Sequence, residues 1–197
     1  MPRYAPEHKR QTRKRVMEAA SRVLRKEGPS RATIPGIMNS VGLTQGAFYA
    51  HFESKDDLLA EAHAEALASA NRRLLARGRA AAPGSEMETI VRHYLSREHR
   101  DNLTGGCPIP AFSGDAIRGP ARVRSAYTQA LTDLLDGLAG LVPESAGKAF
   151  PNMELGLAST LVGGLLLSRA VDDPHLSDRI LTAARTFCLR ALGRGAR

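Results

Sequence analysis

The chain has 197 residues, two cysteines and no tryptophan, and aromatic residues make up only 5% of it. This length allows one large domain or two modest ones, and two cysteines are too few for a disulfide framework. The longest apolar run, Leu155 to Leu167, is too short to cross a bilayer and is interrupted by Gly163 and Gly164. We therefore expect a soluble, cytoplasmic protein with no leader and no membrane segment.

The formal net charge of +8 is unevenly distributed along the chain. Residues 1–55 hold 11 Lys and Arg against 4 Asp and Glu, whereas residues 56–197 hold 17 against 16. A basic segment joined to a neutral remainder indicates a polyanionic partner at one end of the molecule. The alternative is a solvated basic tail that has only general electrostatic affinity.

Helix-forming Ala and Leu are abundant and no run of alternating β-branched residues occurs, so the composition predicts an all-α fold. We expect residues 1–8 to form a flexible basic arm and residues 9–26 to form the first helix. Val16, Ala20 and Leu24 repeat at helical spacing within that helix, and Gly28-Pro29 ends it.

Residues 31–59 predict a helix-turn-helix. Thr33 caps a short helix over 34–40, with Pro35 in the first turn, where its missing N–H is harmless. Gly42 supplies the positive φ of a tight turn, and Thr44 is expected to cap a second helix over 45–52. Ser54 caps the next helix.

Lys55 is unusual, because a lysine in the first turn of a helix opposes the helix dipole. An external anion such as a DNA phosphate explains it better than helix stability does. Together these positions resemble, over roughly residues 13–59, the DNA-binding domain of the TetR family of bacterial transcription regulators. The residues that carry the resemblance are Thr33-Ile34, Ile37, Val41-Gly42, Gly46, Phe48-Tyr49, His51-Phe52, Lys55 and Leu58-Leu59.

The resemblance implies a three-helix DNA-binding domain over residues 1–53, whose helix over 45–52 enters the major groove. The amide of Gln45 is suited to pair with adenine, while the remaining polar groups are suited to phosphates. Phe48 and Phe52 are expected to pack beneath this helix. The predicted DNA-binding residues are Thr33, Thr44, Gln45, Gly46, Ala47, Tyr49, His51 and Lys55.

Base reading by this helix looks sparse, because Gly46, Ala47 and Ala50 offer no hydrogen-bonding side chains. DNA shape, or a methyl contact from Ala47, must then supply part of any specificity. A second reading is therefore a small-molecule sensor whose DNA specificity is weak or vestigial. An enzyme is disfavoured, because no nucleophile array, phosphate loop or paired carboxylate occurs.

For residues 54–197 the resemblance implies a helical effector-binding and dimerisation domain. We expect helices over 54–79, 85–98, 121–141, 151–171 and 174–192, with an irregular segment over 102–110. The predicted effector is a small, mostly apolar molecule. Its candidate contacts, each of which also fits an ordinary core position, are Met87, Val91, Tyr94, Leu95, Cys107, Phe112 and Tyr127.

Two further residues of this segment suggest specific roles. Cys107 at a helix N-terminus would have a lowered thiol pKa, which suits redox sensing, but Cys188 lies in a different apolar stripe and offers no resolving partner, so this role is disfavoured. Asp115 fits a ligand-orienting role, and the alternative is a helix cap or a surface position. His93, His99 and Cys107 have spacings that match no compact metal motif, so we expect no metal and no cofactor.

The last two predicted helices favour a dimer interface. Met153 to Leu167 is apolar nearly all round, and Gly156, Ser159, Gly163 and Gly164 permit close helix approach. Ile180, Ala184, Phe187, Cys188 and Ala191 form one stripe of the final helix. A purely internal core is the alternative. The resemblance thus implies a homodimeric repressor that binds a palindromic operator and is released by its ligand.

Overall fold

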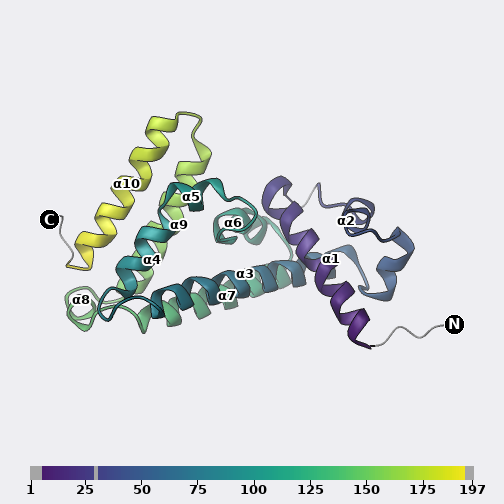
Figure 1. The fold of residues 1–197 in the computed structure, drawn as a ribbon, viewed down its shortest axis with the longest axis horizontal. Coiled ribbons are helices and arrows are strands. Elements are labelled where there is room, and N and C mark those ends of the chain that lie inside the picture. The colour runs from purple at the N-terminus through teal and green to yellow at the C-terminus, as the bar shows by residue number, and fades with distance from the viewer. Residues whose placement is uncertain (1–5, 29–30, 194–197) are drawn as a thin grey trace.

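The computed structural model describes residues 6–28 and 31–193, and every regular element within them is helical (Figure 1), which confirms the all-α prediction. The molecule is elongated, with α1, α2 and η1 at one end and α9 and α10 at the other. The elements are α1 (Pro6–Glu27), α2 (Ile34–Ser40), η1 (Gln45–Ala50), α3 (Lys55–Arg79), α4 (Glu86–Tyr94), α5 (Arg97–Asp101), α6 (Ile109–Arg118), α7 (Ala121–Ala139), α8 (Glu144–Ala149), α9 (Met153–Ala170) and α10 (Pro174–Ala191).

The first helix is longer than we predicted. It begins at Pro6, so residues 6–8 of the expected arm are helical, and Arg3 with the rest of that arm lies outside the described residues. Proline suits a first turn because the N–H that it lacks has no helical partner there. The predicted end is confirmed: Gly28 adopts φ +79° and its N–H donates to the Leu24 carbonyl at 3.0 Å.

Helix α3 is the longest element and connects the two ends of the molecule (Figure 1). It packs against α1, α4 and α7, with α1 near its start and α4 near its end (Figure 1). The hydroxyl of Ser54 accepts the Asp57 N–H at 3.1 Å, which confirms Ser54 as its cap. Because one helix serves both halves, the boundary predicted between residues 53 and 54 stays a prediction.

The middle of the chain differs most from expectation. The helix predicted over 85–98 ends at Tyr94, because Ser96 caps the separate short helix α5 by accepting the His99 N–H at 3.1 Å. The irregular segment ends at Pro108, and α6 then begins at Ile109 with a proline in its first turn. We predicted neither α6 nor α8.

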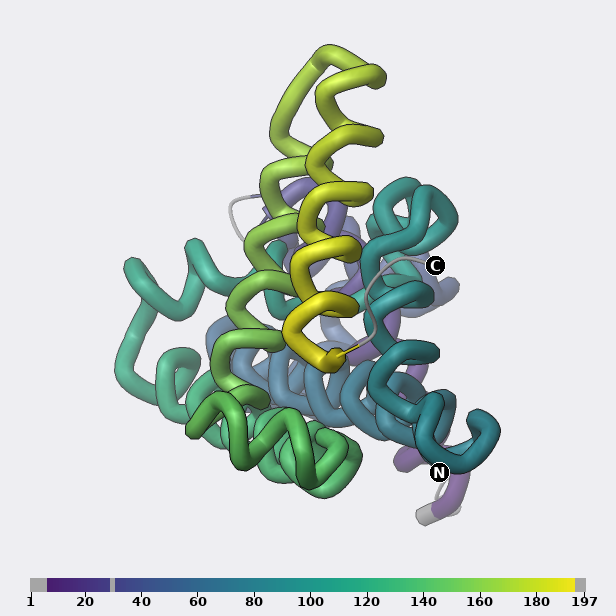
Figure 2. The backbone as a smooth tube through the Cα atoms, turned by 90° about the vertical axis from the view of Figure 1, so that its left-hand side faces the viewer, coloured from purple at the N-terminus to yellow at the C-terminus, as the bar shows by residue number. Residues whose placement is uncertain are grey.

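Helices α9 and α10 are confirmed within about two residues and lie side by side (Figure 2). Close approach occurs at Gly164, where an added Cβ would lie 2.7 Å from the Ala184 Cβ. Gly156 and Gly163 differ, because an added Cβ would meet nothing within 4 Å at either position. These two glycines therefore lie on an open face of α9.

Candidate nucleic-acid interface

The segment between α1 and α3 has the predicted helix-turn-helix geometry. The Thr33 hydroxyl accepts the Gly36 N–H at 3.2 Å, which caps α2 with Pro35 in its first turn. Gly42 adopts φ +73°, and its N–H donates to the Asn39 carbonyl at 3.0 Å. The next N–H, from Leu43, donates to the Met38 carbonyl at 3.0 Å. This paired bonding ends α2 sharply and redirects the chain into η1.

The second helix of the motif corrects our prediction in type and length. It is a 3-10 helix over Gln45–Ala50 rather than an α-helix over 45–52, and Thr44 makes no side-chain cap. The Ala47 N–H instead donates to the Thr44 backbone carbonyl at 3.1 Å, the i to i+3 pattern of a 3-10 turn. Gly46 weakens α-helical preference here. The Thr44 hydroxyl is consequently not engaged in capping.

One side of η1 is anchored in the core. Phe48 and Phe52 are 0% and 4% exposed, and their rings stack with centroids 5.5 Å apart, which confirms that they pack beneath the helix. Tyr49 projects the other way and is 66% exposed, although its ring makes a T-shaped contact with the Phe48 ring, with the ring centroids 5.2 Å apart. Burial of the two phenylalanines fixes which face of η1 is presented to solvent.

All eight predicted DNA-binding residues reach the surface. Ala47, His51 and Lys55 are partly buried, and the others are exposed, namely Thr33, Thr44, Gln45, Gly46 and Tyr49. They come from the start of α2, from η1 and from the start of α3, so the turn at Gly42 brings them together at one end of the molecule. Their contacts with DNA remain predictions.

Arg13 is a positioning residue that the sequence did not reveal. It belongs to residues 1–55, whose basic character predicted a polyanionic partner, but its Nε donates to the His51 carbonyl at 3.3 Å and its Nη2 lies 2.6 Å from the Glu61 carboxylate. The guanidinium also stacks 4.6 Å above the Phe52 ring. These partners lie some 40 residues further along the chain, so no local pattern signals them.

His51 lies in a positive environment. Burial lowers the pKa of His51 first, and the nearby charges of Lys9, Arg13 and His8 lower it further. A neutral imidazole is therefore favoured in the free protein. A phosphate placed beside the same cations would reverse their effect on this pKa, so the surroundings of His51 suit an anion.

The predicted effector contacts lie mostly in the hydrophobic core. Met87, Val91, Leu95 and Phe112 are at most 2% exposed. Tyr94 and Cys107 line a cavity of about 220 Å³ together with polar groups of α3 and α5. Tyr127 is half-buried, and its hydroxyl lies 2.8 Å from the Ser113 hydroxyl.

The redox role considered for Cys107 is not supported. Burial raises the pKa of the Cys107 thiol instead of the helix terminus lowering it, because the residue sits inside the domain ahead of α6. A thiol that stays protonated is a poor nucleophile. Asp115, considered as a ligand-orienting group, lies with one carboxylate oxygen 3.2 Å from Nε2 of buried His63.

His99 has both ring nitrogens committed to the backbone. Its Nδ1 donates to the Tyr94 carbonyl at 2.7 Å, and its Nε2 accepts the Cys107 N–H at 2.8 Å. Burial lowers the pKa of His99 to about 4.

Across residues 6–28 and 31–193, no three His, Cys, Asp or Glu side chains are grouped so as to hold a metal ion. None of the helices in these ranges is long and apolar enough to span a membrane.

Comparison with known proteins supports this interpretation of the motif. Residues 16–62 match the family model described as bacterial regulatory proteins of the tetR family. Residues 16–62 thus carry the N-terminal helix-turn-helix domain of the TetR family. The transcriptional regulator TtgR of Pseudomonas putida is 39% identical over 59 residues, which cover 30% of this chain and 28% of TtgR. The match to this curated TetR-type relative thus spans little more than a quarter of its length.

Solved TetR-family structures share the fold of the whole chain. A regulator from Chloroflexus aurantiacus aligns with a TM-score of 0.74 and 23% identity over 92% of this chain and 96% of its own. A regulator from Cytophaga hutchinsonii aligns with a TM-score of 0.77 and 17% identity, over 94% and 95%. At these identities the likeness extends to the fold, and the TetR-type second domain is shared only as an architecture.

Proposed function

We propose that this protein is a transcription regulator, acting as a repressor, that binds a palindromic operator as a homodimer and is released by a small, mostly apolar ligand. The observation that carries the proposal is the helix-turn-helix, in which buried Phe48 and Phe52 hold η1 so that its polar side chains face outward. The basic character of residues 1–55 supplies the sequence-independent attraction to DNA.

Within this motif the proposed roles divide by chemistry. Gln45, exposed at the first position of η1, reads a base edge, since its amide both donates and accepts. Thr44, Tyr49 and Lys55 bind phosphates and fix the register of the helix on the duplex. Gly46 lets the backbone approach the groove closely, because the space above it is open.

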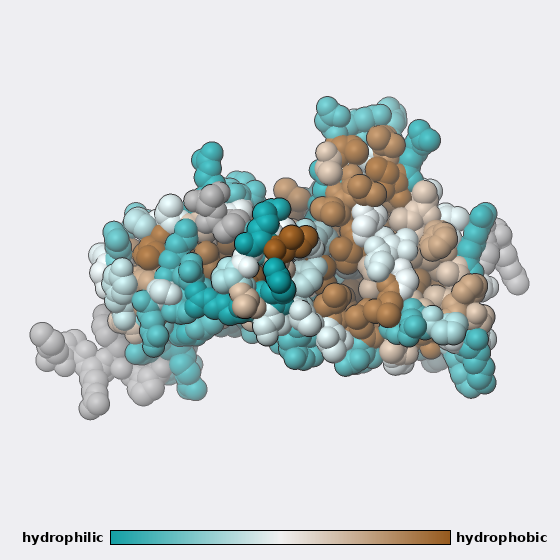
Figure 3. Space-filling view, turned by 180° about the vertical axis from the view of Figure 1, so that it is seen from behind, coloured by the Kyte–Doolittle hydropathy of each residue, from teal (hydrophilic) through white to brown (hydrophobic). Residues whose placement is uncertain are grey.

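Dimerisation is supported by an apolar surface on the last two helices. Leu155, Leu166 and Leu167 of α9 are 46%, 44% and 56% exposed, and Phe187 of α10 is 65% exposed. Figure 3 shows apolar side chains gathered over this part of the surface. With open Gly156 and Gly163 on the same face, two copies are able to approach closely and form a four-helix interface. The two η1 elements of the dimer would then bind DNA half-sites about 34 Å apart.

Ligand control is supported by the cavity beside Tyr94 and Cys107. Its volume of about 220 Å³ is below that of a typical drug-sized site, and Met87, Val91 and Leu95 lie in the same core cluster as these two residues. We infer that a small apolar molecule enters here by displacing core side chains. Ligand would then favour a conformer whose recognition helices no longer match successive major grooves.

The decisive experiment measures DNA binding by Gln45→Ala and Lys55→Ala variants. We expect Gln45→Ala to lose specific affinity about tenfold or more and to keep its affinity for unrelated DNA, because only base contacts specify sequence. Lys55→Ala is expected to weaken binding to specific and to unrelated DNA. It should also reduce the slope of log affinity against log salt concentration by about one. Binding isotherms on the DNA upstream of the protein's own gene and on a scrambled duplex, at several salt concentrations, provide the comparison.

Two outcomes would contradict these roles. Equal losses on both duplexes for Gln45→Ala would remove its assignment as a base reader. A wild-type protein that does not distinguish the two duplexes would favour the alternative of a small-molecule sensor with vestigial DNA specificity, which sparse side-chain chemistry at Gly46, Ala47 and Ala50 motivates.

A further inference from the structure

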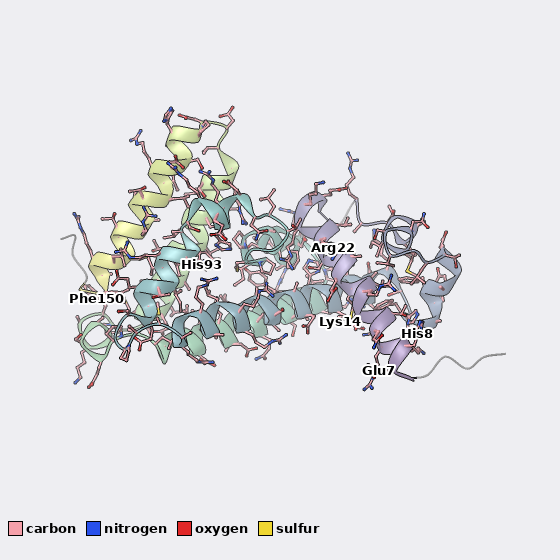
Figure 4. All side chains as sticks on the ribbon, in the orientation of Figure 1. Glu7, His8, Lys14, Arg22, His93 and Phe150 are labelled. Carbon is pink, nitrogen blue, oxygen red and sulfur yellow. The ribbon has the colours of Figure 1, made fainter. Side chains whose placement is uncertain are left out.

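A groove of about 880 Å³ lies between α1, α3 and the segment from Asn102 to Gly105. None of the eight predicted DNA-binding residues lines it. Figure 4 labels two of its lining residues, Lys14 and Arg22, which both come from α1. The groove has two carboxylates in its lining, Glu18 and Glu65, and seven cationic side chains: Arg10, Arg13, Lys14, Arg22, Arg25, Arg72 and Arg73.

Four of these cations have carboxylate partners. Arg10 pairs with Glu7 and Arg13 with Glu61, while Lys14 lies 3.9 Å from Glu18 and Arg72 lies 2.9 Å from Glu65. Both carboxylates of the groove, Glu18 and Glu65, are thus already paired with a cation of the groove. Within the described part of the chain, Arg22, Arg25 and Arg73 have no carboxylate within ion-pair distance.

Two of the three remaining arginines converge on the same loop from different helices. Arg25 of α1 donates to the Gly106 carbonyl at 3.0 Å, and Arg73 of α3 donates to the adjacent Gly105 carbonyl at 3.4 Å. Each is also steadied by a serine one turn earlier on its own helix, Ser21 for Arg25 and Ser69 for Arg73. Neutral acceptors thus hold two guanidinium groups together without cancelling their charge.

This convergence of like charges is electrostatically costly. Burial lowers the pKa of Arg25, and the charges of Arg73 and Arg22 lower it further. A guanidinium has five N–H donors, and the bonds of Arg25 and Arg73 leave donors of both unused on the groove they line. An anion in the groove would relieve the repulsion and accept those donors.

We propose that this groove binds a small molecule carrying at least two negative charges, as phosphate or carboxylate groups, through Arg22, Arg25 and Arg73. The groove volume falls in the range of small-molecule sites. A concave site that includes the 102–105 loop and excludes η1 suits a small anion better than it suits the convex backbone of a duplex.

Such an anion would bridge α1 to α3 and to the 102–105 loop. Occupation of the groove would therefore resist any change in the orientation of the helix-turn-helix relative to the second domain, and so would alter DNA affinity. This consequence rests on the proposed function, whereas anion binding itself does not.

Calorimetric titration with inorganic pyrophosphate at constant ionic strength tests the site. We expect saturable binding to the full-length protein, with orthophosphate binding more weakly because it bears less charge. Arg25→Gln and Arg73→Gln are each expected to weaken pyrophosphate binding about tenfold, the loss of a charge-assisted hydrogen bond. Arg79→Gln is the matched control: it removes the same charge from an exposed position of α3 outside the groove and is expected to bind within twofold of wild type.

Arg22→Gln keeps the test valid if removal of the loop anchors disturbs folding. The side chain of Arg22 is exposed and makes no hydrogen bond or ion pair within the described part of the chain, so we expect the variant to fold normally and to bind several-fold more weakly. Absence of saturable binding to wild type, or equal binding by Arg22→Gln and Arg79→Gln in folded protein, would overturn the proposal.

DNA is the competing occupant, and a second measurement distinguishes it. If Arg22→Gln lowers DNA affinity and its salt slope while wild type does not bind pyrophosphate, the groove contacts DNA phosphates and the small-anion site is wrong. If pyrophosphate binds but leaves operator affinity unchanged, the site stands and the coupling fails. If no DNA binds at all, the proposed function fails independently of the anion site.

Discussion

At the scale of single residues, His99 shows how burial and backbone geometry determine a protonation state. One ring nitrogen donates to a carbonyl and the other accepts an amide N–H, so only one neutral tautomer satisfies both bonds. Protonation would turn the accepting nitrogen into a second donor facing an N–H. His99 is only 5% exposed, so water does not replace the hydrogen bond that protonation would break.

Folding stability is consequently expected to fall in acid through His99. The pKa of His99 is about 4 in the folded chain against 6.5 for an unperturbed histidine, so between these pH values the unfolded state binds the extra proton. Stability contributed by the neutral ring is present above pH 6.5 and is lost as the pH falls toward 4, by ~2–3 kcal/mol.

Urea unfolding of wild type and His99→Gln at pH 7 and pH 4.5 checks this expectation. Glutamine offers a donor and an acceptor but does not titrate, so we expect the variant to lose less stability between the two pH values. Exposed His175→Gln serves as the control and should follow wild type. The same acid sensitivity in His99→Gln would show that carboxylates, not this histidine, cause the loss.

At the scale of elements, the turn between α2 and η1 depends on the backbone freedom of one glycine. Gly42 adopts φ +73°, and an added Cβ would meet no atom within 4 Å. Any cost of substitution there is therefore conformational rather than steric. Gly46, four residues later, has no positive φ, and its added Cβ would lie 4.0 Å from Thr44 Oγ1.

The two glycines should respond differently to the same mutation. We expect Gly42→Ala to lower the free energy of unfolding by ~1 kcal/mol and Gly42→Asn by less, since asparagine tolerates the left-handed region better. Gly46→Ala should not lower it. Denaturant unfolding measures all three. A Gly46→Ala variant as destabilised as Gly42→Ala would contradict a conformational origin.

At the scale of the whole molecule, the apolar face of α9 and α10 predicts the assembly state. Phe187 and Leu167 are exposed beside open Gly156 and Gly163, at the end of the molecule far from the helix-turn-helix. Burial of this face in a dimer would remove apolar surface from water without any rearrangement of the monomer core.

We expect Leu167→Glu and Phe187→Glu to convert a dimer into a monomer, because each places a charge in the proposed interface. Light scattering after size exclusion gives the mass, and circular dichroism verifies the helical content. Ile117→Glu is the control, since Ile117 is an equally exposed apolar residue, at 70%, on α6. A dimer that persists in both interface variants, or a wild-type monomer at micromolar concentration, would refute the interface.

Local chemistry in the sequence determined the helical class, the caps at Thr33 and Ser54, and the turn at Gly42, because these depend on neighbours within a few residues. It also indicated which residues face outward in the motif, since Phe48 and Phe52 are recognisable core side chains. The 3-10 form of η1 departed from the pattern because a six-residue segment is too short for propensity to dominate.

Only the tertiary structure decided the contacts between distant segments. It placed Arg13 on Glu61 and Phe52, separated Phe187 from buried Cys188 on one helix, and brought Arg25 and Arg73 to a single loop. The arginine contacts join residues at least 32 positions apart and arise from packing, so no periodicity within either segment encodes them. Burial likewise decided the pKa of Cys107. The position of this residue before a helix predicted a lowered pKa, but burial raises it.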